Sequence, residues 1–314
     1  MLKTLNQLYK DRIAKGEGRG NWDHAGRPGM VGGSAPAGGG GEGKPEGWSP
    51  IKEGRTSDKI IEKIPFSGKP LNPSGLDTRA MFKGEDGKWT TERQEFHDKI
   101  SDKHFVGKTP VDKPVAYLMG GGPASGKSEF IKSGFGEFPE NSVFVDSDKI
   151  KGEFPEYQKM LEERNQEAAA FSHEESSELS KDIVDRAVAG KYNSVLDGTG
   201  DNNIDNLEAK ISKMRASGSP IIAHYTTIDV TEALARNIYR AGITGRLVKE
   251  EFIRQTYRSI STVVPLAIQR GLYDKFTLWD TTVKVPIKIA SAEKTNLVIH
   301  DKAKWEHFLA GKDR

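Results

Sequence analysis

An apolar run leads into a glycine-rich loop in the stretch VAYLMGGGPASGKSEF, residues 115–130. Residues 121–128 match the pattern G-x-x-x-x-G-K-[S/T] at every position. This pattern binds phosphate only when a buried strand precedes the loop and a helix follows it. The apolar run and the helical pattern after Lys127 supply both. A chance match in a glycine-rich chain is the alternative, and this context argues against it.

Each position of this loop has a chemical task. Glycines let backbone N–H groups turn inward around a phosphate, and the helix that follows adds the positive end of its dipole. Lys127 is expected to reach the outer phosphates, and the Ser128 hydroxyl is expected to bind Mg²⁺. The predicted nucleotide-binding residues are Gly121, Gly122, Pro123, Ala124, Ser125, Gly126, Lys127 and Ser128.

Strand-like and helix-like segments alternate from residue 114 onward. The predicted strands are 115–120, 142–148, 193–200, 221–229 and 276–281. The predicted helices are near 127–133, 154–189, 203–216, 231–241 and 249–270. This alternation favours an α/β fold of the P-loop kinase type, with a mostly parallel sheet and helices on both faces. Ligands bind such sheets at the carboxyl ends of the strands.

The chain divides by composition into three predicted regions. Residues 1–50 hold a short amphipathic helix followed by a glycine-rich leader, which is expected to be disordered because it buries little apolar surface. Within it, GNWDHAGRPGMVGGSAP is either a plain linker or a recognition segment. Residues 51–113 are expected to form a small helical lead-in, with a helix from Thr90 or Thr91 onward. Residues 114–312 form the predicted kinase-like domain.

Composition excludes several classes of protein. The net charge is +2, so the chain lacks the strongly basic character that is typical of proteins that bind nucleic acid. No apolar stretch is long enough to span a membrane, and the N-terminus lacks the apolar core of a secretory signal. The chain has no cysteine, so disulfides and thiolate metal sites are excluded. These features fit a cytoplasmic location.

Acidic residues follow the second predicted strand, in VFVDSDKIK. Asp148 is a candidate general base, because a carboxylate at this strand end can face the terminal phosphate and accept the proton of an attacking hydroxyl. Lys151 is a candidate for holding an anionic substrate. For Asp146 and Asp148 the alternative is that either caps the next helix.

A second acidic site follows the third predicted strand, in NSVLDGTGDNN. Asp197 is expected either to contact Mg²⁺ through water or to bind substrate hydroxyls, with Thr199 beside it. A structural turn without a ligand is the alternative.

Three arginines lie in TEALARNIYRAGITGRLVKEEF. Arg236 and Arg240 are four residues apart on one helical face, and Arg246 follows Gly242 in a segment that resembles a lid. Phosphoryl transfer requires positive charge on the equatorial oxygens of the phosphate, which Arg240 and Arg246 are expected to supply. A solvated basic helix is the alternative, and we favour it for Arg236.

In order and spacing, GGGPASGKS, VDSDKIKGEFPEY, VLDGTG and RNIYRAGITGRLV resemble the motifs of the zeta-toxin kinases. The resemblance covers roughly residues 114–305. It implies a P-loop kinase that uses ATP and Mg²⁺ to phosphorylate a sugar hydroxyl of UDP-N-acetylglucosamine, and an antitoxin partner. It also implies that Lys127, Asp148, Arg240 and Arg246 are catalytic.

By the same resemblance, Lys151, Asp197 and Thr199 bind substrate. The toxins often carry Glu where Asp197 stands, and some carry Arg where Asp201 stands, so the chain departs from the family pattern at the positions expected to bind the acceptor. Two alternatives remain. One is a kinase for another hydroxyl, such as an antibiotic or a polynucleotide 5′-end, and the other is a phage or mobile-element protein that binds nucleotide without catalysis.

Overall fold

The computed structural model describes residues 77–313 except 166, 201 and 245. These residues belong to one compact unit, residues 64–314. The helix expected over residues 1–15 and the glycine-rich leader lie outside the described residues. Among the helices that are described, none has the length and apolar character needed to cross a membrane.

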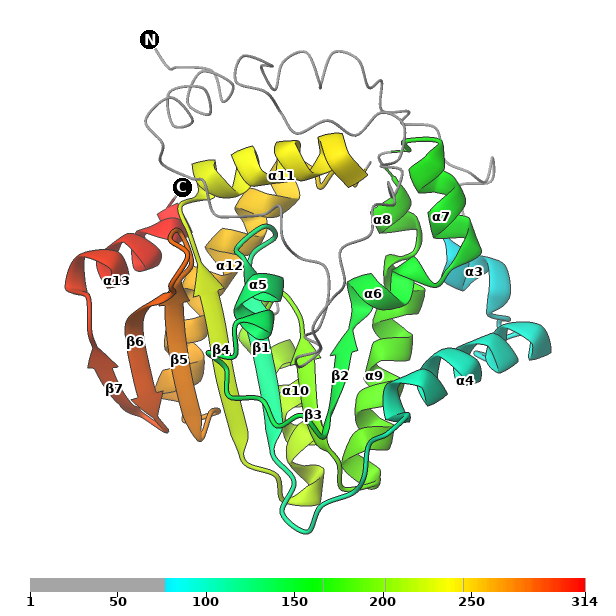
Figure 1. Cartoon of the computed structure of the whole chain (residues 1–314), viewed down its shortest axis with the longest axis horizontal. Coiled ribbons are helices and arrows are strands. Elements are labelled where there is room, and N and C mark those ends of the chain that lie inside the picture. The colour runs from blue at the N-terminus through cyan, green and yellow to red at the C-terminus, as the bar shows by residue number, and fades with distance from the viewer. Residues whose placement is uncertain (1–76, 166, 201, 245, 314) are drawn as a thin grey trace, which may run out of the picture. The chain divides into compact units, whose positions relative to one another are not determined.

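A seven-stranded sheet with the order β2-β3-β1-β4-β5-β6-β7 forms the centre of the fold (Figure 1). Its strands are β1 (Ala116–Gly121), β2 (Ser142–Asp146), β3 (Asn193–Asp197), β4 (Ile221–Thr227), β5 (Lys275–Asp280), β6 (Ile287–Glu293) and β7 (Asn296–Ile299). The five strands from β2 to β5 run parallel, whereas β6 and β7 add an antiparallel edge. The predicted mostly parallel α/β sheet is therefore confirmed.

Helices cover the two faces of the sheet unequally. The short helix α5 lies on one face, and α9, α10 and α12 lie on the other (Figure 1). The described helices are α3 (Thr78–Phe82), α4 (Thr91–Phe105), α5 (Lys127–Lys132), α6 (Ser147–Gly152), α7 (Pro155–Glu162), α8 (Ala168–Phe171), α9 (His173–Ala189), α10 (Ile204–Met214), α11 (Val230–Thr244), α12 (Glu250–Gln269) and α13 (Lys302–Leu309), with 3₁₀ turns η2 (Arg215–Ser217) and η3 (Ala310–Asp313).

The core lies between the sheet and the helices α9, α10 and α12. Leu118 of β1, Ile183 of α9 and Leu207 of α10 are buried there in one apolar cluster. All six residues of β1 are buried, because β3 and β4 cover both edges of this strand and helices pack on its two faces. A strand buried in this way needs a continuous apolar run, which explains why VAYLMG was recognisable in the sequence.

The helix expected from Thr90 or Thr91 is confirmed as α4. The Thr90 side chain caps it by accepting a hydrogen bond from the Arg93 backbone N–H at 3.3 Å. Ile100 of α4 is buried in the main core cluster, and α4 contacts both α9 and β2.

Three details differ from the predicted elements. Strand β2 ends at Asp146 rather than residue 148, because the next residues begin α6. The helical region expected over 154–189 is divided into α7, α8 and α9, and Arg164 in the left-handed region with φ 53° follows α7. The hairpin β6–β7 was not predicted, because every residue of β7 is exposed and the strand lacks a buried apolar run.

Candidate functional site

The loop of residues 121–128 starts where β1 ends and closes into α5, so it lies at the carboxyl edge of the parallel sheet. Gly121 has φ +139°, and a Cβ there would lie 2.6 Å from the Thr226 carbonyl oxygen. Gly126 has φ +83° and precedes the first residue of α5. Both positions require glycine because their φ angles are positive, and Gly121 also has no room for a Cβ.

Lys127 reaches back over this loop. Its Nζ donates hydrogen bonds to the carbonyl oxygens of Gly121 at 2.7 Å and Gly122 at 3.3 Å. Ser128 is exposed, and Ser125 is buried with its Oγ 2.8 Å from Thr226 Oγ1. A cation over a glycine-rich loop, beside an exposed hydroxyl, fits the phosphates of a nucleotide and a magnesium ion.

Asp148 lies in the first turn of α6, not on the strand that was expected to carry it. Asp146 is the helix cap, because its Oδ1 accepts the backbone N–H groups of Asp148 at 2.9 Å and Lys149 at 3.4 Å. Of the two alternatives, the capping role therefore falls to Asp146. The Asp148 carboxylate is left to point away from the α6 backbone, into the site.

Two cations hold the Asp148 carboxylate. Lys151 Nζ lies 3.1 Å from Oδ1, and Arg246 lies 2.5 Å from Oδ2. Burial by itself would raise the pKa of Asp148, but the charges of Arg246 and Lys151 prevail and hold it well below its usual range. Lys151 is only 5% exposed, so its charge acts at close range with little screening.

Arg240 belongs to α11 and Arg246 to the segment after it; Arg246 pairs with Asp148, and Arg240 lies near enough to both for their charges to affect its pKa. Burial lowers the pKa of Arg240, and the charge of Arg246 lowers it further. The carboxylate of Asp148 raises the pKa of Arg246 against the effect of burial. The Nε atoms of both arginines are buried and have no hydrogen-bond partner within the described part of the chain. Buried guanidinium donors of this kind suit an anion.

Arg236 has contacts that differ from those of a solvated basic helix. Its Nε is 2.9 Å from Glu232, and it also donates to the Thr281 carbonyl oxygen at 3.3 Å. A Cβ placed on Gly126 would be 3.8 Å from the Arg236 guanidinium. Arg236 therefore lies beside the phosphate loop rather than in bulk solvent, contrary to the interpretation favoured from the sequence.

Asp197 ends β3, in register with Met119 of β1 and Asp146 of β2. Burial raises the pKa of Asp197 to about 7, and the neighbouring carboxylates Asp146 and Asp148 add to the shift while Lys127 opposes it. Its Oδ1 is buried without a hydrogen-bond partner among the residues described. A metal ion or its water shell would satisfy this oxygen.

Thr199 follows Asp197 in the same turn. Its carbonyl oxygen accepts the Gly121 N–H at 3.3 Å, and the residue itself is exposed. The turn after β3 is therefore joined to the start of the phosphate loop, which brings Asp197 and Lys127 to one edge of the sheet.

Tyr157 is a site residue that the sequence did not indicate. It belongs to α7, is 4% exposed, and lies near enough to Arg246, Asp148 and Arg240 for their charges to affect its pKa, which burial raises. In the sequence its spacing from Phe154 matches an ordinary core position. His173, at the start of α9, is affected by Lys151 and Asp148, and burial and Lys151 lower its pKa.

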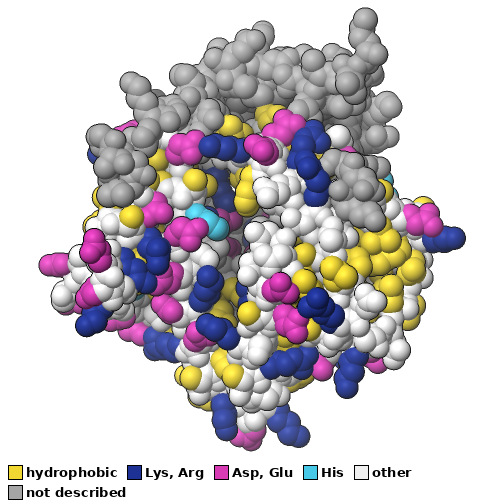
Figure 2. Space-filling view, turned by 180° about the vertical axis from the view of Figure 1, so that it is seen from behind, with side chains coloured by type: hydrophobic (Ala, Val, Ile, Leu, Met, Phe, Trp, Pro, Cys, Tyr) yellow, Lys and Arg dark blue, Asp and Glu magenta, His cyan; other side chains and the backbone are white. Residues whose placement is uncertain are grey.

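The described surface is hollowed on the side opposite the view of Figure 1, and Lys and Arg side chains lie within the hollow (Figure 2). Among the described residues, no cluster of three or more His, Asp or Glu side chains could hold a metal ion by itself. A metal at this site would therefore need oxygens from the bound nucleotide as well, as Mg²⁺ in phosphoryl-transfer enzymes does.

The sequence is similar to several toxins. It is 29% identical to toxin zeta of Enterococcus hirae over 108 residues, which is 33% of this chain and 38% of that protein. It is 25% identical to toxin PezT of Streptococcus pneumoniae over 93 residues, which is 30% of this chain and 37% of that protein. These alignments span less than two fifths of either relative.

Solved structures share the fold. One comes from the PezAT chromosomal toxin–antitoxin system of Streptococcus pneumoniae, with TM-score 0.52, 14% identity and coverage of 64% of this chain and 80% of that chain. Another is the AvrRxo1-ORF1:-ORF2 complex with ATP, with TM-score 0.58, 12% identity and coverage of 76% and 82%. A model of the zeta toxin family matches residues 97–297, more than half of the chain. The chain therefore belongs to the zeta toxin family.

Proposed function

We propose that this protein is an ATP-dependent kinase that transfers the γ-phosphate of ATP to a hydroxyl of a small molecule. The observation that carries the proposal is the ion pair of Asp148 with Arg246, 98 residues apart in sequence. It places a candidate base and a candidate lid arginine together at the strand edge that also carries Lys127. A protein that only hydrolyses ATP has no acceptor hydroxyl to deprotonate, so a base at this position favours a kinase.

The proposed chemistry is an in-line transfer. The acceptor oxygen forms a bond to the γ-phosphorus as the bond from phosphorus to the bridging oxygen breaks, and ADP leaves with that electron pair. Asp148 takes the proton of the acceptor hydroxyl. Arg240 and Arg246 stabilise charge on the equatorial oxygens, and Lys127 holds the outer phosphates. Ser128 is the residue that would hold Mg²⁺, which would neutralise charge on the phosphate oxygens.

The pairing of Asp148 changes during this reaction. With Arg246 bound, its pKa is too low for an effective base. When Arg246 swings to the phosphoryl group, its attraction is lost, and only Lys151 still opposes the effect of burial, which raises the pKa. The carboxylate then becomes a stronger base at the moment when the acceptor must lose its proton.

For the acceptor we propose UDP-N-acetylglucosamine or a related sugar nucleotide, on the family resemblance. Lys151 would bind its anionic part, and Asp197 and Thr199 would bind near the sugar. The shorter side chain of Asp197, where relatives often carry Glu, leaves room for a different acceptor. Growth inhibition of a bacterial host, relief by an antitoxin and a cytoplasmic site of action are further parts of this proposal.

The test uses the full chain with ATP, Mg²⁺ and separate candidate acceptors: UDP-N-acetylglucosamine, an aminoglycoside and an oligonucleotide with a 5′-hydroxyl. Mass spectrometry should show the mass of one phosphate added to the sugar nucleotide. Transfer should be abolished in Lys127→Ala and reduced at least about 10²-fold in Asp148→Asn. Undiminished transfer in both variants would refute the proposed site, and transfer to another acceptor alone would refute the sugar nucleotide.

A further inference from the structure

Two side chains from outside the phosphate loop hold its backbone. Thr281 Oγ1, directly after β5, donates a hydrogen bond to the Ser125 carbonyl oxygen. Tyr257 of α12 donates to the Pro123 carbonyl oxygen at 3.4 Å. The Tyr257 ring also packs on Gly122, where a Cβ would lie 2.2 Å from a ring carbon.

The loop has a conformation that needs such support. Ala124 has φ 61°, a left-handed conformation that is unfavourable for a residue with a Cβ. A conformation of this kind persists where the surrounding structure imposes it. The hydrogen bonds to Pro123 and Ser125 act on the residues directly before and after Ala124.

Thr281 is itself held from the C-terminal helix. The preceding residue, Asp280, is buried, and its carboxylate lies 2.6 Å from Lys304 Nζ of α13. This carboxylate also accepts the Thr282 N–H at 2.8 Å. The Thr281 N–H donates to the Thr227 carbonyl oxygen of β4 at 3.2 Å. Lys304 and Asp280 therefore fix the turn from which Thr281 reaches Ser125.

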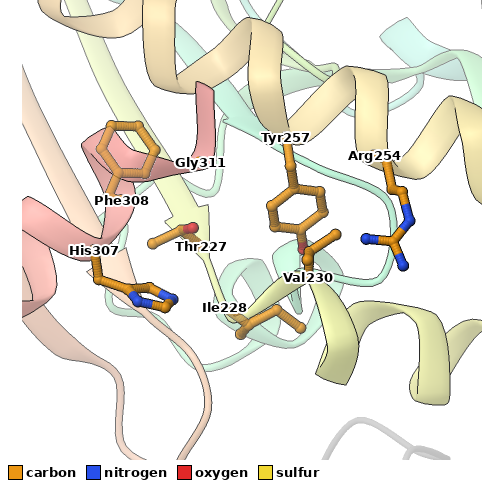
Figure 3. A pocket seen from close by; sticks show the side chains of 8 residues that line it. All are labelled: Thr227, Ile228, Val230, Arg254, Tyr257, His307, Phe308 and Gly311. Atoms are coloured by element: carbon orange, nitrogen blue, oxygen red, sulfur yellow. The ribbon is translucent and has the colours of Figure 1, made fainter. Parts of the chain in front are cut away.

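The same part of the chain packs against the helix α12 that carries Tyr257. Figure 3 shows its ring facing a small pocket, with Phe308 and Gly311 on the other side. The backbone of Gly311 approaches α12 closely, since a Cβ there would lie 3.3 Å from Ser261 Oγ and 3.8 Å from the Tyr257 carbonyl oxygen. His307 pairs with Asp229 at 3.1 Å and joins α13 to the start of α11.

We propose that residues 302–311 are a positioning element for the phosphate loop, acting through Thr281 and Tyr257. This segment follows residue 297, where the match to the family ends. The two routes reach the loop on either side of Ala124 and keep its carbonyl groups turned as phosphate binding requires. The inference rests on the proposed binding of ATP by this loop, but it concerns affinity rather than transfer.

The test is isothermal titration of the full-length protein with ADP and with Mg-ATP. Thr281→Val keeps the shape and removes one hydrogen bond, so the affinity for both nucleotides should fall about fivefold to tenfold. Thr281→Ser keeps the hydroxyl and should bind like the wild type. Thr277→Val, in the strand β5 that precedes Thr281 and in register with His224 and Ser291, is the matched control and should not change the affinity.

The route through α13 is tested by Lys304→Met, with Lys302→Met as its control on the exposed face of the same helix. Lys304→Met should also weaken nucleotide binding. If it acts through Thr281, the double variant Lys304→Met/Thr281→Val should bind no more weakly than Thr281→Val alone, whereas independent effects would multiply.

Three results would overturn the inference: wild-type affinity in both Thr281→Val and Lys304→Met, failure of Thr281→Ser to retain binding, or effects of the two changes that multiply fully. A wild-type protein that binds no nucleotide would overturn both this inference and the proposed function. If nucleotide binds and the variants behave as expected but no acceptor is phosphorylated, only the proposed function fails.

Discussion

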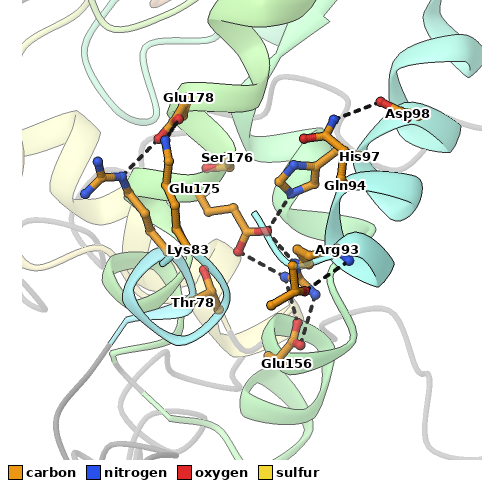
Figure 4. A network of polar contacts seen from close by, with 12 residues as sticks. Thr78, Lys83, Arg93, Gln94, His97, Asp98, Glu156, Glu175, Ser176 and Glu178 are labelled. Atoms are coloured by element: carbon orange, nitrogen blue, oxygen red, sulfur yellow. Dashed lines mark hydrogen bonds and ion pairs between the residues drawn. The ribbon is translucent and has the colours of Figure 1, made fainter. Parts of the chain in front are cut away.

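A buried ionic network joins the helix before the sheet to the helices around the site, and breaking it should destabilise the protein strongly (Figure 4). Arg93 of α4 donates to the Glu175 carboxylate of α9 at 2.5 and 3.0 Å, and to Glu156 of α7 at 3.1 and 3.2 Å. His97 Nε2 lies 2.6 Å from the same Glu175 carboxylate. Arg93→Met removes the charge and keeps most of the apolar stem.

The size of the expected loss in stability follows from the burial of both partners. Glu175 is fully buried and Arg93 is 7% exposed, so the variant leaves a carboxylate in the interior with much of its compensation lost. Removing one partner of a buried ion pair costs about 3–5 kcal/mol. Arg93 also stacks on the Phe82 ring, 4.2 Å from its centroid, and methionine does not replace that cation–π contact. We expect a melting temperature lower by roughly 6–20 °C.

Urea unfolding followed by circular dichroism measures this loss, because the midpoint shift at constant slope gives the change in unfolding free energy. The matched control is Arg186→Met. Arg186 pairs with Asp102 at 2.7 Å across the same two helices, α9 and α4, but both partners are exposed. The control should lose at most about 1 kcal/mol through its ion pair. Equal losses in Arg93→Met and Arg186→Met would refute the burial argument.

The pH dependence gives a second measurement. Although burial opposes it, hydrogen bonds from His97 and Arg93 lower the pKa of Glu175 below its ordinary 4.5. Its contribution to stability is therefore complete above pH 4.5 and is lost as the pH falls through the lower folded pKa. Without Arg93, burial should raise the pKa of Glu175. Protonation of Glu175 at low pH then removes the buried charge and with it part of the loss in stability. The difference in stability between wild type and Arg93→Met should shrink from pH 7 to pH 4, and a constant difference would contradict this explanation.

Three further predictions concern the site. Gly122→Ala places a Cβ against the Tyr257 ring and should abolish detectable nucleotide binding in isothermal titration, with the fold retained by circular dichroism. Arg246→Met should raise the pKa of Asp148 from its low wild-type value, because only Lys151 then opposes the effect of burial; carboxyl-carbon NMR titration would show it, and an unchanged low value would contradict it. In the ligand-free protein, the pKa of Asp197 is raised, so its contribution to stability falls as the pH rises from about 3.8 to about 7. Urea unfolding should therefore give a lower stability at pH 8 than at pH 5, and Asp197→Asn should reduce this difference.

Local sequence patterns were sufficient for the parts of this protein that depend on neighbouring residues. The phosphate loop needs particular residue types at fixed spacing, so residues 121–128 were recognisable without a structure. The five parallel strands all contribute buried apolar residues, and β1 is buried along its whole length, so the strands appear as short apolar runs. The helices α11 and α12 were predicted within a few residues at each end, because each has an apolar face with helical spacing.

Tertiary structure decided which distant side chains meet. Arg93 and Glu175 are 82 residues apart, Asp148 and Arg246 are 98 apart, and Ser125 and Thr281 are 156 apart. Local patterns marked Asp148 and Arg246 as separate candidates, but no local pattern reports that they pair, because the two residues meet only when α6 and the segment after α11 come together. The sequence by itself thus determined that a phosphate loop sits in a parallel sheet. Only the packing of helices and strands from both ends of the described chain decided what holds that loop and what neutralises the acids beside it.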